Sequence, residues 1–288
     1  MLFLHTASDN WYSWDPHPDV LLLVALLAAG YIYAIHYLRP KISDAGRVKR
    51  SQITCFFLGV LVIYVASSSP MHELSEEYLL SVHMFQHLLF TMVAAPLFLA
   101  GIPGWLWQAL LSKRWAMLIG QRLTNPLVAF ALFNLLLLLT HLPPAVELAL
   151  QMEAFHFLVH AALVAAALLM WWPILSPVPE LPRLPYPGQM AYLFLQSLLP
   201  AVLASFVTFS DRVVYEPYAE APRLWGLSAI EDQQIAGGIM KTLGTAILWT
   251  FIAVAFFKWY EKEEAMSRPP RWREVEEELQ EIGLNWEK

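Results

Sequence analysis

The sequence predicts an all-α integral membrane protein, a bundle of about seven transmembrane helices. Of its 288 residues 58% are apolar and 15% are charged, and the mean hydropathy is +0.48. Soluble domains have about 45–50% apolar and about 25% charged residues. Apolar runs of about 20 residues, enough to cross a hydrocarbon core of about 30 Å as a helix, recur along the chain. Because lipid offers no partner to an exposed backbone amide, we expect these runs to be helices and not strands.

The expected spans follow one another through most of the chain. Residues 1–17 form an N-terminal arm, and residues 261–288 form a charged tail with apolar residues at helical spacing beside glutamates, the pattern of an amphipathic surface helix. The membrane domain is therefore expected over residues 18–260. Its seven spans are 18–38, 50–69, 78–100, 126–142, 153–173, 188–211 and 230–260.

Lysine and arginine are concentrated at one end of these spans. Fifteen of the 18 lie in or beside the connections after the first, third and fifth spans or in the C-terminal tail. Only Arg212 and Arg223 lie at the other end, and Lys241 lies inside the seventh span. Basic residues in short loops favour the cytoplasmic side of a membrane. We therefore expect the N-terminus outside and the C-terminus in the cytoplasm, an arrangement that requires an odd number of spans.

Several classes of function are excluded by what the sequence lacks. The single cysteine, Cys55, rules out a disulfide framework, a cysteine-rich zinc module and a CxxC redox centre, so any metal must be bound by His, Met or carboxylates. The net charge of −6 and the scattered basic residues do not fit a nucleic-acid partner. The sequence contains no HExxH, Walker or GxSxG motif. We expect a protein that is not an enzyme.

Two pairs of histidines lie one helical turn apart inside predicted spans, His83 with His87 and His156 with His160. Side chains four residues apart project from one face of a helix about 6 Å apart, close enough to share one ion. Because the third and fifth spans run in the same direction, both pairs lie at one depth, in the outer half of the membrane. Ionisable groups at that depth are costly and tend to be functional. Further ligands are expected from Met71, His72, His141 and Met240, with Glu153, Asp232 and Gln233 orienting the imidazoles and balancing charge.

The ligand types indicate which metal this site would bind. Neutral imidazole suits copper, zinc, iron and nickel, and thioether sulfur adds a preference for Cu(I). Met71, Met84 and Met240 near the histidines favour Cu(I), with zinc and haem as alternatives. A haem-binding electron-transfer protein would use facing histidines as axial ligands. A copper permease would need polar residues that continue to the cytoplasmic side, where the third and fifth spans are apolar. A further alternative is a bundle whose histidines only tie helices together.

Five motifs occur in this order along residues 10–260. They are Ser69-Pro70-Met71-His72-Glu73-Leu74; His83-Met84-Phe85-Gln86-His87 running into Ala95-Pro96 and Gly101-Ile102-Pro103; Thr140-His141-Leu142-Pro143; His156-x-x-x-His160; and Asp232-Gln233-Gln234-x-Ala236-Gly237-x-x-Met240. In this combination the chain resembles the CtaG family of cytochrome c oxidase assembly factors, the polytopic type linked to caa-type oxidases.

The resemblance implies a multi-pass protein of the bacterial cytoplasmic membrane that helps to mature a haem–copper oxidase by supplying or inserting copper at the outer side. It implies as partners the subunits of cytochrome c oxidase and the lipid bilayer, with a copper chaperone outside the membrane as a further expected partner. The residues that match the family motifs are His72, His83, His87, His141, His156, His160, Asp232, Gln233 and Met240.

Overall fold

A computed structural model describes residues 17–42, 45–68 and 70–267 of the chain. These residues form helices joined by turns and short connections, with no β-strand among them, which confirms the predicted all-α class. The expected N-terminal arm, apart from His17, lies outside the described residues. So does the part of the expected amphipathic tail that follows Ser267.

Within the described residues, six helical segments are long and apolar enough to cross a bilayer. They confirm the predicted first, second, third, fifth, sixth and seventh spans, and the last one continues beyond its predicted end. The segments are Pro18–Lys41, made of α1 (Pro18–Tyr33), η1 (Ala34–Leu38) and η2 (Arg39–Lys41); α2 (Arg50–Ser68); Leu80–Gly101, made of α4 (Leu80–Leu88), η4 (Leu89–Ala94) and α5 (Ala95–Gly101); α10 (Glu153–Leu175); α11 (Tyr186–Phe209); and α13 (Ala229–Ser267).

The predicted fourth span, 126–142, is not a single straight helix of spanning length. Helix α8 (Pro126–Thr140) has 15 residues, which at about 1.5 Å per residue is shorter than a hydrocarbon core of about 30 Å. It reaches spanning length only together with α7 (Arg114–Leu123), and the two are bent by 70°. The bend has a local cause, because the Asn125 side chain accepts a hydrogen bond from the Leu127 N–H and Pro126 occupies the first turn, so that a new helix begins there. The described chain thus has six spans, or seven if the bent pair counts as one.

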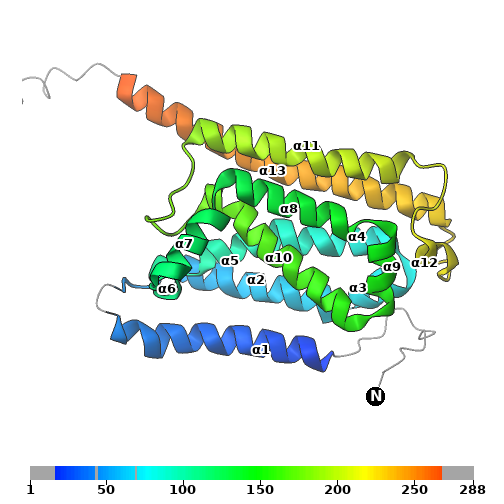
Figure 1. The fold of residues 1–288 in the computed structure, drawn as a ribbon, viewed down its shortest axis with the longest axis horizontal. Helices are drawn as coiled ribbons and strands as arrows, with labels where there is room; N and C mark the ends of the chain where they lie inside the picture. The colour runs from blue at the N-terminus through cyan, green and yellow to red at the C-terminus, as the bar shows by residue number, and fades with distance from the viewer. Residues whose placement is uncertain (1–16, 43–44, 69, 268–288) are drawn as a thin grey trace, which may run out of the picture.

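The histidine-bearing segment α4–η4–α5 occupies the centre of the bundle. It contacts α2, α10 and α13, and it is the most buried of the six spans. In Figure 1, α11 and α13 run together along one side of the molecule and α1 runs along the opposite side. The largest apolar core lies among the central helices, around Leu99, Phe133, Trp171 and Leu193.

Short helices close both ends of the bundle. One end, called here the histidine end, is formed by α3 (Pro70–Glu73), η3 (Leu74–Tyr78), α9 (Pro143–Gln151), α12 (Glu216–Glu220) and the first turn of α1 (Figure 1). Helix α6 (Gly104–Leu110) and α7 lie at the opposite end, where the connections rich in lysine and arginine are found.

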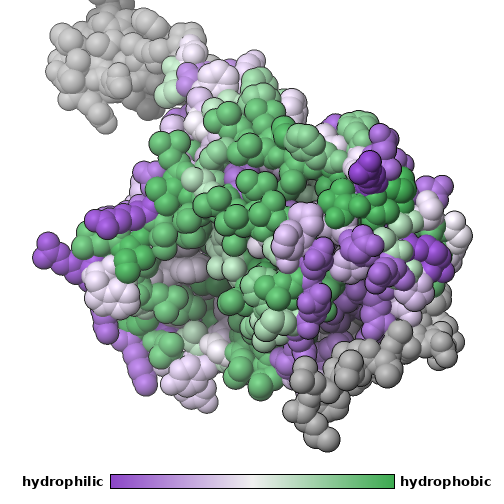
Figure 2. All heavy atoms as spheres, turned by 45° about the vertical axis from the view of Figure 1, so that its right-hand side comes forward, coloured by the Kyte–Doolittle hydropathy of each residue, from purple (hydrophilic) through white to green (hydrophobic). Residues whose placement is uncertain are grey.

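The outer surface of the helices is apolar, the reverse of a soluble protein. Large side chains such as Leu127, Phe206 and Phe209 are 79%, 73% and 73% exposed. Figure 2 shows broad areas of hydrophobic side chains on one face of the molecule, with hydrophilic ones gathered toward its edges. Contiguous exposed apolar surface of this extent marks contact with a membrane or a partner. Together with the six spanning helices, it makes the chain a multi-pass membrane protein.

Helices α11 and α13 lie in close contact at Gly237. A Cβ atom placed there would lie 2.7 Å from the carbonyl oxygen of Ala204 and 2.9 Å from the backbone nitrogen of Thr208. The next residue, Gly238, has nothing within 4 Å of the corresponding position. Only the first glycine is therefore required by the packing of the two helices.

This pair of glycines provides a test of the packing. We expect Gly237→Ala to destabilise the protein by about 1–3 kcal/mol, because the added methyl group forces the two backbones apart. Gly238→Ala is its matched control and should be neutral or stabilising by about 0.5–1 kcal/mol, because alanine favours the helix. Thermal unfolding of the detergent-solubilised proteins measures both, and equal midpoints for the two variants would contradict the close approach.

Candidate metal centre

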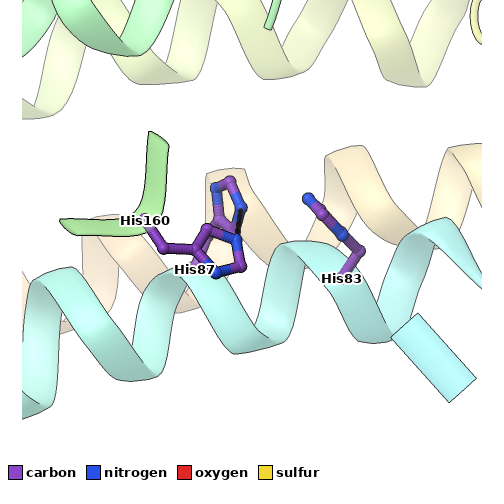
Figure 3. A group of neighbouring side chains, drawn as sticks. All are labelled: His83, His87 and His160. Carbon is purple, nitrogen blue, oxygen red and sulfur yellow. Dashed lines mark hydrogen bonds between the residues drawn. The ribbon is translucent and has the colours of Figure 1, made fainter. Parts of the chain in front are cut away.

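Three histidine side chains from two helices converge inside the bundle near its histidine end. His83 and His87 come from α4 and His160 comes from α10, and one ring nitrogen of each lies within 4.8 Å of the others (Figure 3). The Nε2 atoms of His87 and His160 are 3.0 Å apart. Ligand nitrogens about 2 Å from a tetrahedral metal ion are separated by about 3.3 Å. The three rings therefore need only small shifts to share one ion.

The fourth histidine of the two predicted pairs joins this group. His156 Nε2 lies 3.1 Å from His160 Nε2, and its ring stacks on that of His83 with centroids 5.6 Å apart. The Nε2 atom of His160 thus faces two other Nε2 atoms, those of His87 and His156. A neutral ring nitrogen carries either one proton or one lone pair, so it cannot satisfy both neighbours with hydrogen bonds. A cation bound by His160 together with His83 and His87 would replace the contact between His87 and His160 by metal–ligand bonds.

Further ring nitrogens in the same region are buried without a hydrogen-bond partner. Among the described residues these include Nδ1 of His83, Nδ1 of His87 and Nε2 of His141. A buried polar atom left without a partner is costly, and most such atoms in proteins are paired. This donor set, neutral imidazoles in an apolar surrounding, fits a transition-metal ion.

A cavity of about 40 Å³ borders the histidines on the side of α13 and α8. His87 and His141 line it, with their rings perpendicular and their centroids 5.5 Å apart. Three thioether side chains, Met84, Met92 and Met240, line it as well. On this measure about 10–15 Å³ is enough to hold one water molecule, so the cavity has room for an ion. Its lining places soft sulfur atoms beside the imidazoles.

The remaining residues expected as ligands lie apart from the three converging rings. His72 lies on α3 at the histidine end, where its Nε2 atom is 3.2 Å from a carboxylate oxygen of Glu76. Met71 packs against the apolar cluster around Phe56 and Phe90 and does not line the cavity.

The three residues expected to orient imidazoles have other surroundings. Glu153 is exposed at the start of α10. Asp232 accepts hydrogen bonds from the backbone N–H groups of Leu80 and Ser81, at 2.7 and 3.2 Å, and from the Ser81 hydroxyl. These bonds cap the first turn of α4, whose N–H groups have no partner within the helix. Gln233 binds the backbone of Val207, Arg212 and Val214, and so holds the connection after α11.

The carboxylate beside the imidazoles is Glu76, which the sequence reasoning missed. Its Oε1 atom lies 3.0 Å from Nδ1 of His156 and 3.2 Å from Nε2 of His72. Burial raises the pKa of Glu76, but the hydrogen bond with His156 and the nearby imidazoles outweigh this effect and lower it to about 2. Burial lowers the pKa of His72, an effect that Glu76 opposes. The spacing His72-x-x-x-Glu76 was the signal available in the sequence.

Gln86 is a second residue that the sequence reasoning did not single out. Its side chain is fully buried and donates from Nε2 to the carbonyl of Ala66 at 2.7 Å. Its Oε1 atom accepts from the Ser75 hydroxyl at 3.3 Å, and the Tyr218 hydroxyl donates to the Ser75 carbonyl at 2.7 Å. Gln86 thus ties α4 to the end of α2 and to η3, between the two histidines of α4.

The central segment also has an irregular turn directly after His87. Residues Leu89–Ala94 form a π-helical turn, and Pro96 follows it without an N–H group to donate. The carbonyl of Thr91, five residues before Pro96, accepts instead from the indole N–H of Trp171 at 2.9 Å. This bond fastens α4–η4–α5 to α10, the two helices that carry the four converging imidazoles.

Comparison with known proteins places the chain in a family. Residues 29–262, most of the chain, match the profile described as cytochrome c oxidase caa3 assembly factor (Caa3_CtaG). The chain belongs to this family. The resemblance to CtaG inferred from the five motifs is thereby confirmed.

More distant similarities add little about function. An uncharacterised protein of Mycobacterium bovis and one of Mycobacterium tuberculosis are each 24% identical to the chain over 258 residues, which cover 84% of this chain. The chain spans only 38% of the length of these curated relatives. No solved structure matches it.

The cap on α4 can be tested by mutation. We expect Asp232→Ala to destabilise the protein by about 1–2 kcal/mol, because the first N–H groups of α4 lose their acceptor. Asp211→Ala removes an exposed aspartate near the same end of the bundle and serves as the control, with an expected change within about 0.5 kcal/mol. Thermal unfolding in detergent measures the two effects, and an Asp232→Ala midpoint equal to that of the control would contradict the capping role.

Proposed function

We propose that the protein assists the assembly of a haem–copper cytochrome c oxidase by binding copper between its histidines and delivering it to the oxidase. We further propose that it does so in the bacterial cytoplasmic membrane with the histidine end outside, as the distribution of lysine and arginine favours. The observation that carries the proposal is the convergence of His83, His87 and His160, in which Nε2 of His160 lies 3.0 and 3.1 Å from the Nε2 atoms of His87 and His156, contacts that simple hydrogen bonds do not satisfy together.

The surroundings of these rings support Cu(I) as the ion. Cu(I) prefers soft ligands, and the thioether groups of Met84, Met92 and Met240 line the cavity that borders His87. A singly charged ion also loses less hydration energy than a doubly charged one when it enters an apolar bundle. Zinc takes its sulfur ligands from cysteine thiolates and not from thioethers, so the methionines favour copper over zinc.

The depth of the centre supports delivery and not transport across the membrane. The four converging histidines lie in the first two turns of α4 and α10. Further along α10, residues 161–170 are all apolar, and Ala166, Ala167 and Met170 among them belong to the largest core cluster. An ion would find no ligand there on its way to the opposite end. Copper is therefore expected to enter and leave at the histidine end.

The spacing of the rings argues against the haem-binding alternative. Two axial nitrogens on opposite sides of one iron are separated by about 4 Å, twice a bond of about 2 Å, and the macrocycle must fit between the rings. His87 and His160 face each other at 3.0 Å, and the rings of His83 and His156 pack directly against this pair.

Copper binding by purified variants tests the proposal. Loss of a group that only supports a metal ligand lowers metal affinity by about 10–100-fold. We expect His160→Ala to weaken Cu(I) binding by more than this, because it removes the ring that faces two others. His36→Ala removes an exposed histidine of η1 at the opposite end and should leave binding unchanged. Competition with a chromophoric Cu(I) chelator measures the affinity, and wild-type binding by His160→Ala would contradict the site.

The role in assembly is tested in cells of the source bacterium. We expect deletion of the gene to lower haem–copper oxidase activity, and added copper to restore part of it. The wild-type chain and His36→Ala should restore full activity, whereas His160→Ala at equal membrane abundance should not. Full restoration by His160→Ala would mean that assembly does not depend on the metal centre.

A further inference from the structure

A second group of polar side chains connects the metal centre with the surface at the histidine end. One carboxylate oxygen, Oε1 of Glu76, lies 3.2 Å from Nε2 of His72 and 3.0 Å from Nδ1 of His156. The exposed fraction falls inward along this group, from 31% for the Glu76 side chain and 19% for His72 to 7% for His156. The group therefore reaches from solvent to the buried rings.

His156 belongs to both groups. Its Nδ1 atom faces Glu76 and its Nε2 atom lies 3.1 Å from Nε2 of His160. Without a bound cation, a carboxylate next to Nδ1 favours a proton on that nitrogen, which leaves the lone pair of Nε2 directed toward His160. A cation bound beside Glu76 takes the place of this proton, which leaves to solvent and returns when the cation moves on to the inner centre. One imidazole thus presents a nitrogen to each group without any change of rotamer.

We propose that His72, Glu76 and His156 form a second cation site, an entry site that captures Cu(I) and passes it through His156 to the inner centre of His83, His87 and His160. The entry site rests on the proposed copper function and adds to it the route by which the ion arrives. Glu76 supplies the negative charge that attracts the cation, and His72 supplies the first imidazole.

The ligands of the two sites predict a difference in Cu(I) affinity that favours inward transfer. The entry site combines two imidazoles with a carboxylate, a hard ligand that suits Cu(I) poorly, whereas the inner centre has three imidazoles beside a cavity lined by thioethers. Cu(I) should therefore bind more weakly at the entry site than at the inner centre. A weak outer site and a stronger inner site favour movement toward the inner one.

Neighbouring side chains extend the entry site toward the start of α1. The ring of His17 meets that of His72 edge to face, with centroids 4.6 Å apart. His17 Nε2 also lies 4.0 Å from a carboxylate oxygen of Glu73, whose side chain is 9% exposed. A second carboxylate and a further imidazole thus lie beside the entry site, and the added negative charge favours the approach of a cation.

The rate of copper uptake separates an entry site from a merely structural group. We expect Glu76→Gln to slow transfer of Cu(I) from a chromophoric chelator into the full-length protein in lipid nanodiscs by about tenfold at low salt, because the attracting charge is lost. The equilibrium affinity of the inner centre should stay within a few-fold of wild type, because the glutamine carbonyl still accepts from His156. Raising the salt concentration should narrow the difference between the two rates.

Two further variants complete the experiment. Glu220→Gln removes an exposed carboxylate of α12 at the same end and should load copper at the wild-type rate. His72→Ala should slow uptake as Glu76→Gln does, again with little change in affinity, and it tests the entry site independently if Glu76→Gln does not fold.

The outcomes distinguish this proposal from the one on which it rests. Wild-type uptake by both Glu76→Gln and His72→Ala would overturn the entry site and leave copper binding intact. A lowered affinity with an unchanged rate would also overturn it, because Glu76 would then act only by orienting His156. If the wild-type protein takes up no Cu(I) from the chelator, the copper function and the entry site both fail.

Discussion

The structure depends on the placing of several imidazoles in an apolar bundle, where water cannot satisfy them. Each ring nitrogen there must find a hydrogen bond or a cation, because a buried polar atom without a partner is costly. His87, His156 and His160 meet at Nε2 atoms 3.0 and 3.1 Å apart, a contact that one proton cannot satisfy for all three rings. The cation that we propose at this point would link the packing of α4 and α10 to the function of the protein.

The rest of the bundle holds these two helices in place. Asp232 fixes the start of α4 from α13, and Trp171 fixes its continuation from α10 through the carbonyl that Pro96 leaves free. Gln86, between the two histidines of α4, binds the carbonyl of Ala66 at the end of α2. A rigid frame of this kind keeps ligands near their binding geometry before the ion arrives, which lowers the cost of binding.

A site that delivers its ion must also release it. A closed structural site surrounds its metal with all the ligands that it needs, whereas an exchangeable one keeps a position open. Here the imidazoles lie close to one end of the bundle, and polar residues continue from them through Glu76 to the surface. Entry from this end, as we propose, would not require copper to pass the apolar residues 161–170 of α10.

The sequence by itself determined the class of fold and most of the spans, because the length and apolarity of a lipid-crossing helix are local properties of the chain. It also showed that His83 with His87 and His156 with His160 share helix faces, since a helical repeat fixes that spacing. Only the tertiary structure decided that Glu76 and not Glu153 lies beside His156, and that the 126–142 region bends away from α7. A contact between residues 80 positions apart, such as Glu76 and His156, depends on how the helices rotate and cross. The spacing of residues within one helix does not predict this arrangement.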